Sequence, residues 1–299
     1  TPVIPHRLQI GDTIGIVAPA SPFDIDQFSS GVGLLESNGF KVRIPKKIFQ
    51  KNGYFAGPDA QRASLFMEMF DDPVIKAIVC ARGGFGSMRI LPLIDYSRIC
   101  NQPKILVGFS DVTALLTALY VQCGIVTFHG PVVASLPVID EMSINALISA
   151  LAQETPVELT ASGGEVIRSG LGVGPVLAGN LTTLCHLIGT PFQPDSSGHI
   201  LLFEDRGEAP YRLDRMLSHL QLAGFLDGIA GVGFGYFEDC GNPKEFKRII
   251  MERFRDAPYP VLTGIEFGHG KRNLTLPVGL DASLDTDQVR LTYHASATK

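Results

Sequence analysis

The sequence pattern that most strongly suggests catalysis places a serine where an apolar strand meets a helix. Residues 104–109 predict a strand that leads directly into a helix, and Ser110 stands between the two. A tight turn of this kind lifts a hydroxyl above the edge of a sheet, and the N–H of Asp111 then lies at a helix N-terminus, ready to stabilise an oxyanion. Val112 replaces the second glycine of the G-x-S-x-G pattern, so a simple helix N-cap at Ser110 is the alternative.

A glycine-rich loop follows the preceding strand. Residues 82–87 read Arg-Gly-Gly-Phe-Gly-Ser, and glycines at the carboxyl end of a strand let backbone amides approach a ligand closely. The loop fails as a dinucleotide fingerprint, because Arg89 stands where the last glycine should be. The chain also has no Gly-Lys-Ser/Thr sequence, which weakens a nucleotide-dependent enzyme as an interpretation. An ordinary glycine loop stays open as an alternative.

A serine hydroxyl needs a base and an orienting acid before it can attack a carbonyl. Among seven histidines, His269 stands out in a polar loop bracketed by glycines after a predicted strand, and His129, at the end of another strand, is its rival. Glu204 lies where a strand stops and is the candidate acid. Asp205 and Glu208 are neighbouring alternatives. These acidic residues could also form a solvated turn that has no catalytic role.

The elements that must position these residues differ between the two halves of the chain. In the first half, short apolar strands alternate with helical patterns, which predicts an α/β fold with an open, doubly wound parallel sheet and ligands beyond the carboxyl ends of its strands. The second half has more short strands and favours a smaller β-barrel-like domain. We therefore expect three parts: an α/β domain over residues 1–160, a glycine-rich linker over 161–178 and a β-rich domain over 179–299.

Composition narrows the class of protein. The chain has 299 residues, 45% hydrophobic and 18% charged, which excludes a disordered chain. A net charge of −5 argues against a nucleic-acid-binding surface over the whole molecule. No apolar run approaches the roughly 20 residues of a membrane span, and Thr1–Gly11 lacks the apolar core of a signal peptide. We therefore expect a cytoplasmic protein without nucleic-acid or membrane partners.

The five cysteines are widely spaced and contain no C-x-x-C pair. This pattern favours reduced thiols over a disulfide framework, and it offers no cysteine-rich zinc site. No H-E-x-x-H or similar spacing of metal ligands occurs either. We expect neither a metal nor an organic cofactor.

Taken together, these segments resemble the LD-carboxypeptidase family of serine peptidases, which includes the muramoyltetrapeptide carboxypeptidases and the microcin C self-immunity peptidases. The resemblance runs along nearly the whole chain, and the order and spacing of its motifs make it specific. The segments that carry it are Ala81–Arg89, Gly108–Leu115, Phe128–Pro131, Gly179–Leu181, Leu202–Asp205, Tyr211–Leu217 and Gly268–His269.

The resemblance assigns a role to each candidate. It implies that Ser110 is the nucleophile, Glu204 the acid and His269 the base, with oxyanion-hole amides at Asp111 and at Gly84 rather than its neighbour Gly83. It also implies a flavodoxin-like or Rossmann-like first domain, a β-barrel-like second domain, a site between them and a homodimer.

The implied reaction is hydrolysis of an L,D-peptide bond that releases the terminal D-alanine of a murein tetrapeptide in peptidoglycan recycling. The absence of a long insertion favours this branch over a microcin C-type peptidyl-nucleotide amidase, and a non-catalytic ligand-binding protein is the alternative from another class. A terminal carboxylate needs a cation, and arginine binds carboxylates in bidentate fashion. The arginines flanking the site are Arg82, Arg89, Arg206 and Arg212, of which we name Arg82 and Arg212 as the substrate-binding candidates.

Overall fold

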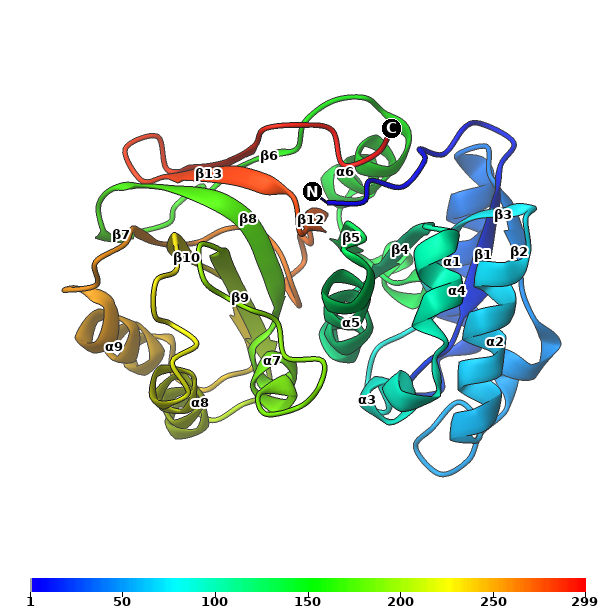
Figure 1. Ribbon diagram of the computed structural model, residues 1–299, viewed down its shortest axis with the longest axis horizontal. Coiled ribbons are helices and arrows are strands. Elements are labelled where there is room, and N and C mark those ends of the chain that lie inside the picture. The colour runs from blue at the N-terminus through cyan, green and yellow to red at the C-terminus, as the bar shows by residue number, and fades with distance from the viewer. Residues whose placement is uncertain (1) are drawn as a thin grey trace.

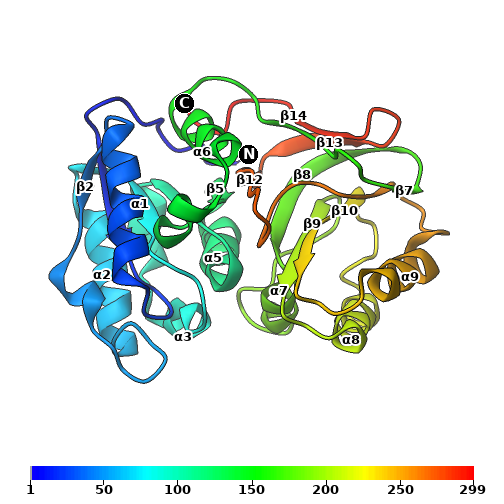
Figure 2. The ribbon, with the colours of Figure 1, turned by 180° about the vertical axis from the view of Figure 1, so that it is seen from behind.

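The computed structural model describes residues 2–299 and contains two sheets, each with its own helices (Figures 1 and 2). The first sheet has six strands in the order β12-β5-β4-β3-β1-β2. Its strands are β1 (Thr13–Val17), β2 (Lys41–Arg43), β3 (Ile75–Cys80), β4 (Ile105–Gly108), β5 (Thr127–His129) and β12 (Leu276–Val278). Strands β1 to β5 are parallel and follow the flavodoxin-like order 2-1-3-4-5. The predicted α/β fold with a doubly wound parallel sheet is confirmed.

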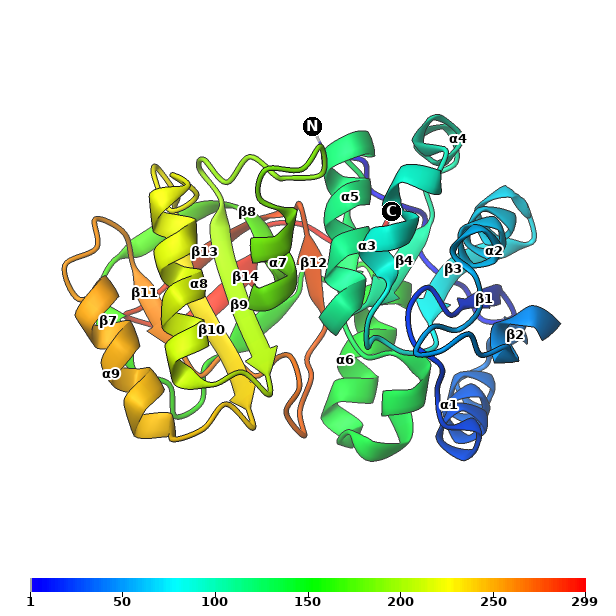
Figure 3. The same cartoon turned by 90° about the horizontal axis from the view of Figure 1, so that it is seen from below.

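Helices cover both faces of this sheet (Figure 3). The helices of this half are α1 (Ile25–Ser37), α2 (Asp59–Asp71), α3 (Ser87–Ile90), α4 (Tyr96–Asn101), α5 (Thr113–Cys123) and α6 (Glu141–Ala152). Alternate residues of a strand point to opposite faces, so Ile14 and Val79 join one apolar core with α1 and α6, whereas Val17 and Ile78 join another with α2 and α5. Burial on both faces explains why these strands are apolar throughout.

The second sheet has eight strands in the order β6-β14-β13-β8-β9-β10-β11-β7 and curls strongly, which gives the second domain its expected barrel-like form (Figure 1). Its strands are β6 (Glu158–Thr160), β7 (Val166–Arg168), β8 (Leu171–Asn180), β9 (Ile200–Arg206), β10 (Gly231–Glu238), β11 (Val261–Thr263), β13 (Asp281–Asp285) and β14 (Arg290–Tyr293). Its helices are α7 (Leu181–Leu187), α8 (Pro210–Leu222) and α9 (Pro243–Phe254). The four strands β8 to β11 are parallel, so the carboxyl ends of β9 and β10 lie at one edge.

Two features differ from the expected division of the chain. The glycine-rich segment 161–178, expected as a linker, contains β7 and most of β8. A Cβ on Gly174 would lie 2.0 Å from the carbonyl oxygen of Gly198, so this glycine allows a close backbone approach instead of marking a hinge. Strand β12, from the second half of the chain, pairs antiparallel with β5 and completes the first sheet.

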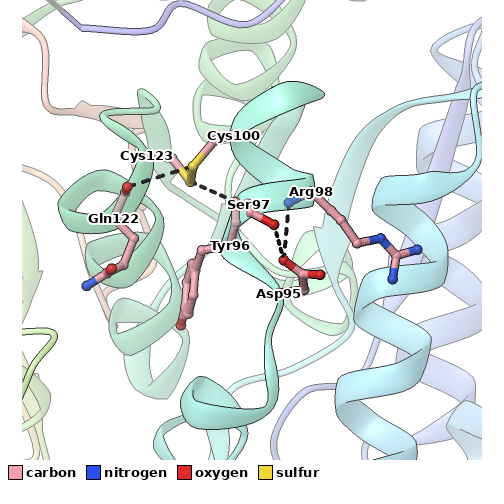
Figure 4. Close-up of a disulfide and its surroundings, with 7 residues drawn as sticks. All are labelled: Asp95, Tyr96, Ser97, Arg98, Cys100, Gln122 and Cys123. Carbon is pink, nitrogen blue, oxygen red and sulfur yellow. Dashed lines mark hydrogen bonds between the residues drawn. A yellow bond between two sulfur atoms is a disulfide. The ribbon is translucent and has the colours of Figure 1, made fainter.

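The expectation of five reduced cysteines is wrong. Cys100, near the end of α4, and Cys123, the last residue of α5, form a disulfide (Figure 4). They are 23 positions apart, and only the packing of α4 on α5 brings them together, so their spacing in the sequence gives no signal. The cysteines Cys80, Cys185 and Cys240 are free and buried.

Candidate active site

Ser110 lies at the carboxyl end of β4 in a strained turn. Its φ is +63°, a conformation that non-glycine residues adopt rarely and that is typical of functional sites held by the surrounding fold. Residues Ser110–Val112 form a short 3-10 turn, closed by a 3.2 Å hydrogen bond from the N–H of Val112 to the carbonyl of Phe109, and α5 follows at Thr113. This is the strand–turn–helix arrangement expected from the sequence, and it leaves the serine partly exposed.

The structure brings three of the predicted side chains together from distant parts of the chain. Ser110 Oγ lies 3.1 Å from His269 Nε2, and His269 Nδ1 lies 2.6 Å from Glu204 Oε2. The histidine therefore bridges a hydroxyl and a carboxylate with its two ring nitrogens, which is the arrangement that lets an imidazole take a proton from a serine.

Glu204 is completely buried, yet it stays ionised. Burial would raise the pKa of this carboxyl, but the neighbouring imidazoles of His269 and His129 act in the opposite direction and lower the pKa from 4.5 to about 2. The N–H of His269 also donates a 3.2 Å hydrogen bond to Glu204 Oε2. A carboxylate held in this way fixes the orientation of the imidazole and stabilises its protonated form.

The loop that carries His269 is tied to the first domain. Arg272 donates a hydrogen bond of 2.7 Å to Asp140, the N-cap of α6, and forms a second ion pair with Glu266 in its own loop. The N–H of Asn273 binds Ser143 Oγ at 2.9 Å, and the Asn273 side chain accepts a hydrogen bond from the N–H of Gly268. These contacts hold the histidine against Ser110 across the boundary between the two halves.

Gly268 is a further residue of the site. In the sequence it stands out only as one of the glycines that flank His269. Its φ is +99°, and a Cβ at this position would lie 2.5 to 2.6 Å from three side-chain atoms of Glu204. A glycine directly before a candidate histidine is the sequence signal for such an approach.

A cleft of about 580 Å³ opens in front of Ser110 and His269. Gly83 and Gly84 of the glycine-rich loop form part of its wall, and Gly84 has a φ of +104°. Asp111 holds this loop in place, because its buried carboxylate accepts a 2.7 Å hydrogen bond from the N–H of Ser87. The glycine-rich loop, the serine turn and the histidine therefore face one cavity, which a substrate can enter.

The four candidate arginines occupy different places. Arg82 and Arg206 line the cleft. Within residues 2–299, Arg212 does not line the cleft. It is exposed at the start of α8 beside Glu208 and Tyr211. Arg89 is paired with Asp59. Glu204 and Arg206 are two residues apart in β9 and so share one side of the strand, a signal that could have pointed to Arg206.

The alternative acids serve other purposes. Asp205 points to the other side of β9, where its carboxylate binds the side chain of Asn180 at 2.9 Å and both the N–H and the hydroxyl of Thr182 at the start of α7. Glu208 lies 3.5 Å from Arg212. The rival histidine, His129, is buried behind Glu204.

Over residues 2–299, the structure contains no group of three or more His, Cys, Asp or Glu side chains arranged to hold a metal ion. None of the helices within the same residues has the length and apolar character needed to cross a membrane.

Comparison with known proteins agrees with the fold and identifies the family. The family model of the LD-carboxypeptidase N-terminal domain matches residues 14–130, and that of the LD-carboxypeptidase C-terminal domain matches residues 173–284. The probable murein peptide carboxypeptidase of Bacillus subtilis (strain 168) is 36% identical over 304 residues, covering 99% of this chain and 95% of that protein.

Two solved structures are similar over nearly their full length. MccF in complex with glutamyl sulfamoyl guanosine has a TM-score of 0.91 at 27% identity and covers 100% of both chains. The muramoyltetrapeptide carboxypeptidase from Oxalobacter formigenes has a TM-score of 0.84 at 30% identity and covers 94% of this chain and 97% of its own.

These findings define the protein first as a hydrolase, a carboxypeptidase of the serine type. The chain belongs to the LD-carboxypeptidase family. The resemblance stated from the motifs is thereby confirmed, and the alternative of a non-catalytic ligand-binding protein is wrong.

Proposed function

We propose that the protein releases the terminal D-alanine from murein tetrapeptides by hydrolysis of an L,D-peptide bond, with Ser110 as nucleophile, His269 as base and Glu204 as the orienting acid. The observation that carries this proposal is the unbroken chain of contacts from Ser110 Oγ to His269 Nε2 at 3.1 Å and from His269 Nδ1 to Glu204 Oε2 at 2.6 Å. The names of the similar murein peptide carboxypeptidases support the choice of substrate.

The reaction follows from these contacts. Ser110 Oγ attacks the carbonyl carbon while His269 Nε2 takes the hydroxyl proton, and a tetrahedral intermediate forms. The N–H groups of Gly84 and Asp111 stabilise its oxyanion. His269 then gives the proton to the leaving D-alanine nitrogen as the C–N bond breaks. Water, deprotonated by the same histidine, hydrolyses the acyl-enzyme and restores the serine.

A carboxypeptidase must also recognise the free carboxylate of its substrate. Arg82 follows β3, lines the cleft and donates a 2.6 Å hydrogen bond to the carbonyl of Pro22, which leaves other guanidinium N–H groups for a ligand. We propose Arg82 as the carboxylate-binding residue, with Arg206, which also lines the cleft and is paired with Asp239, as the second candidate. Arg212, the other candidate from the sequence, lies beside Glu208 instead.

A peptidyl-nucleotide substrate is the second candidate function, because the structural similarity to MccF bound to glutamyl sulfamoyl guanosine extends over the whole chain. The same three side chains would serve both reactions. The test is therefore incubation with a murein tetrapeptide and, separately, with an aminoacyl sulfamoyl nucleoside, with and without EDTA. Release of D-alanine supports the first function, whereas cleavage of the nucleoside conjugate alone supports the second.

Two serines of the cleft provide a matched pair of variants for this test. Ser110→Ala removes the proposed nucleophile, whereas Ser135→Ala removes a hydroxyl that lines the same cleft and binds the carbonyl of Val132. We expect loss of activity only in Ser110→Ala, and no effect of the chelator. Activity that survives in Ser110→Ala, or that EDTA abolishes, would exclude this mechanism.

The expected homodimer and cytoplasmic location belong to this proposal as predictions. Light scattering of the purified chain measures the first, and fractionation of cells measures the second. The Cys100–Cys123 disulfide weighs against a reducing compartment, because disulfides are rare in the cytosol.

A further inference from the structure

The two carboxylate oxygens of Glu204 face two different histidines. Oε2 accepts the hydrogen bonds of His269 described above. Oε1 is buried and has no hydrogen-bond partner within residues 2–299, and it lies 3.9 Å from Nε2 of His129. This distance is longer than a hydrogen bond, so the structure places a ring nitrogen and a carboxylate oxygen opposite each other without joining them.

His129 has no other described partner for its ring. The side chain is completely buried, and both of its nitrogens lack a hydrogen-bond partner among the described residues. The aromatic rings of Phe109 and Phe267 meet it edge-on, with ring centroids 6.0 and 5.3 Å away. Its backbone lies at the end of β5, opposite Gly108 on one side and Leu276 on the other. The fold therefore fixes this imidazole between aromatic rings, with Glu204 Oε1 within 3.9 Å of its Nε2.

Leaving His129 Nε2 and Glu204 Oε1 without hydrogen bonds would destabilise the fold. A buried polar group without a partner costs free energy, and a buried carboxylate oxygen costs more than a neutral group. A shift of about 1 Å would bring Nε2 and Oε1 to an ordinary hydrogen-bond distance and satisfy both. The low pKa of Glu204 agrees with a second imidazole that stabilises the ionised carboxylate.

We propose that His129 is a positioning residue of the reaction: its Nε2–H donates a hydrogen bond to Glu204 Oε1 and holds the carboxylate so that Oε2 stays aligned with His269. This inference rests on the proposed roles of Ser110, His269 and Glu204. His129 transfers no proton in the reaction. The alignment matters most when His269 becomes an imidazolium, because the carboxylate must then keep its charge and its place.

The titratable groups next to Glu204 are His269, His129 and Asp205. Asp205 is turned to the opposite side of β9, where Asn180 and Thr182 occupy both of its oxygens. Removing the donor on Oε1 makes Glu204 more basic, so proton uptake by the Glu204–His269 pair becomes easier. The acidic limb of the pH profile of kcat/KM should then move to higher pH.

Two substitutions separate positioning from packing. His129→Phe keeps an aromatic ring but removes the donor, whereas His129→Gln loses the ring but carries an amide N–H near the place of Nε2. We expect His129→Phe to lower kcat about 10- to 100-fold with little change in KM and to shift the acidic limb upwards. His129→Gln should restore most of kcat and the original limb. The reverse order, with Phe active and Gln impaired, would mean that the ring only packs and would overturn the inference.

A measurement on the unmodified protein covers the case in which a variant fails to fold. Long-range ¹H–¹⁵N spectra of the full chain labelled at histidine report which nitrogen of each ring carries the proton. We expect Nε2 of His129 to carry a proton, with an Nε2–H signal that moves in Glu204→Gln. A ring of His129 without a proton on Nε2 would overturn the inference.

The outcomes also distinguish this inference from the proposed function. Activity retained in Ser110→Ala contradicts the proposed function itself. Loss of activity in Ser110→Ala together with normal kcat and pH profile in His129→Phe contradicts only the role of His129. The tautomer measurement needs no substrate and stands apart from both.

Discussion

Ser110 combines an unfavourable backbone conformation with a neighbouring base. Glu204 shows how strongly the surroundings of a side chain can change its pKa. Burial alone would raise the pKa of the Glu204 carboxyl, but two neighbouring imidazoles reverse this effect. A group in this position affects stability as well as chemistry, since a pKa that differs between the folded and unfolded chain makes folding depend on pH.

Glu204 therefore predicts a specific pH dependence of stability. Its pKa in the folded chain is about 2, below the ordinary value of 4.5, so the ionised carboxylate stabilises the fold above pH 4.5, and this contribution is lost as the pH falls towards 2. In Glu204→Gln, the free energy of unfolding should fall less steeply below pH 4.5 than in the unmodified protein. Urea denaturation at a series of pH values measures both slopes, and equal slopes would contradict the assignment. We also expect kcat of Glu204→Gln to fall by about 10³–10⁴.

Gly268 predicts a loss of activity at a residue without any functional group. Gly268→Ala places a methyl group against Glu204 and should lower kcat about 100-fold, because small displacements of catalytic groups are costly. Gly189→Ala is the matched control: its φ is +80°, but a Cβ there meets nothing within 4 Å. Gly189→Ala should lose about 1–2 kcal/mol of stability from the left-handed backbone, Gly268→Ala should lose at least as much, and only Gly268→Ala should lose activity. Equal kinetics of the two variants would show that the contact with Glu204 is unimportant.

At the scale of elements, the sequence predicts best where a pattern repeats. The apolar strands and the helices between them give the first sheet, and the break after β4 gives the position of Ser110. Strand β12 is different, since it has three residues, contains Pro277 and pairs with a strand some 150 positions earlier. No local periodicity identifies such a partner.

The residues of the site likewise divide into those that local sequence patterns indicate and those that only packing determines. Ser110, Glu204 and His269 each end a predicted strand or follow one, so their types and places mark them in the sequence. The choice between Glu204 and Asp205 depends on which side of β9 each faces, and the exclusion of Arg212 from the cleft depends on the direction of α8. These are properties of packing, which a single sequence does not reveal.

The disulfide that joins α4 to α5 leads to a prediction about stability. A disulfide that closes a loop of 23 residues should stabilise the fold by about 3 kcal/mol by limiting the unfolded chain. Cys100→Ser, or reduction with dithiothreitol, should therefore lower the free energy of unfolding by this amount. Activity should change little, because Cys123 ends α5 whereas Ser110 precedes its beginning.

Counting thiols checks the same link directly. The protein, denatured without reductant, should show three reactive thiols, those of Cys80, Cys185 and Cys240. Five thiols would contradict the disulfide. Cys240→Ser serves as the control for removal of a single buried thiol.

At the scale of the whole molecule, the two halves of the chain depend on each other. The first sheet ends in β12 from the second half, and the last residue, Lys299, exchanges hydrogen bonds with Pro5 and Arg7 near the start of the chain. Helix α5 packs against α7 and β8 of the second domain. The proposed nucleophile belongs to the first half, whereas its base and acid belong to the second.

Separating the halves should therefore abolish hydrolysis. Residues 1–160 alone keep Ser110 but lack His269 and Glu204, and they leave β5 without its neighbour β12, so we expect no release of D-alanine and a fragment that aggregates or unfolds readily. Co-expression with residues 161–299 should restore part of the activity, because the missing strand and the missing side chains return together. Ser110→Ala in the larger fragment is the control for background hydrolysis. Catalysis by residues 1–160 on their own would mean that the reacting groups lie within one half and that the contacts of Ser110 with His269 do not drive the reaction.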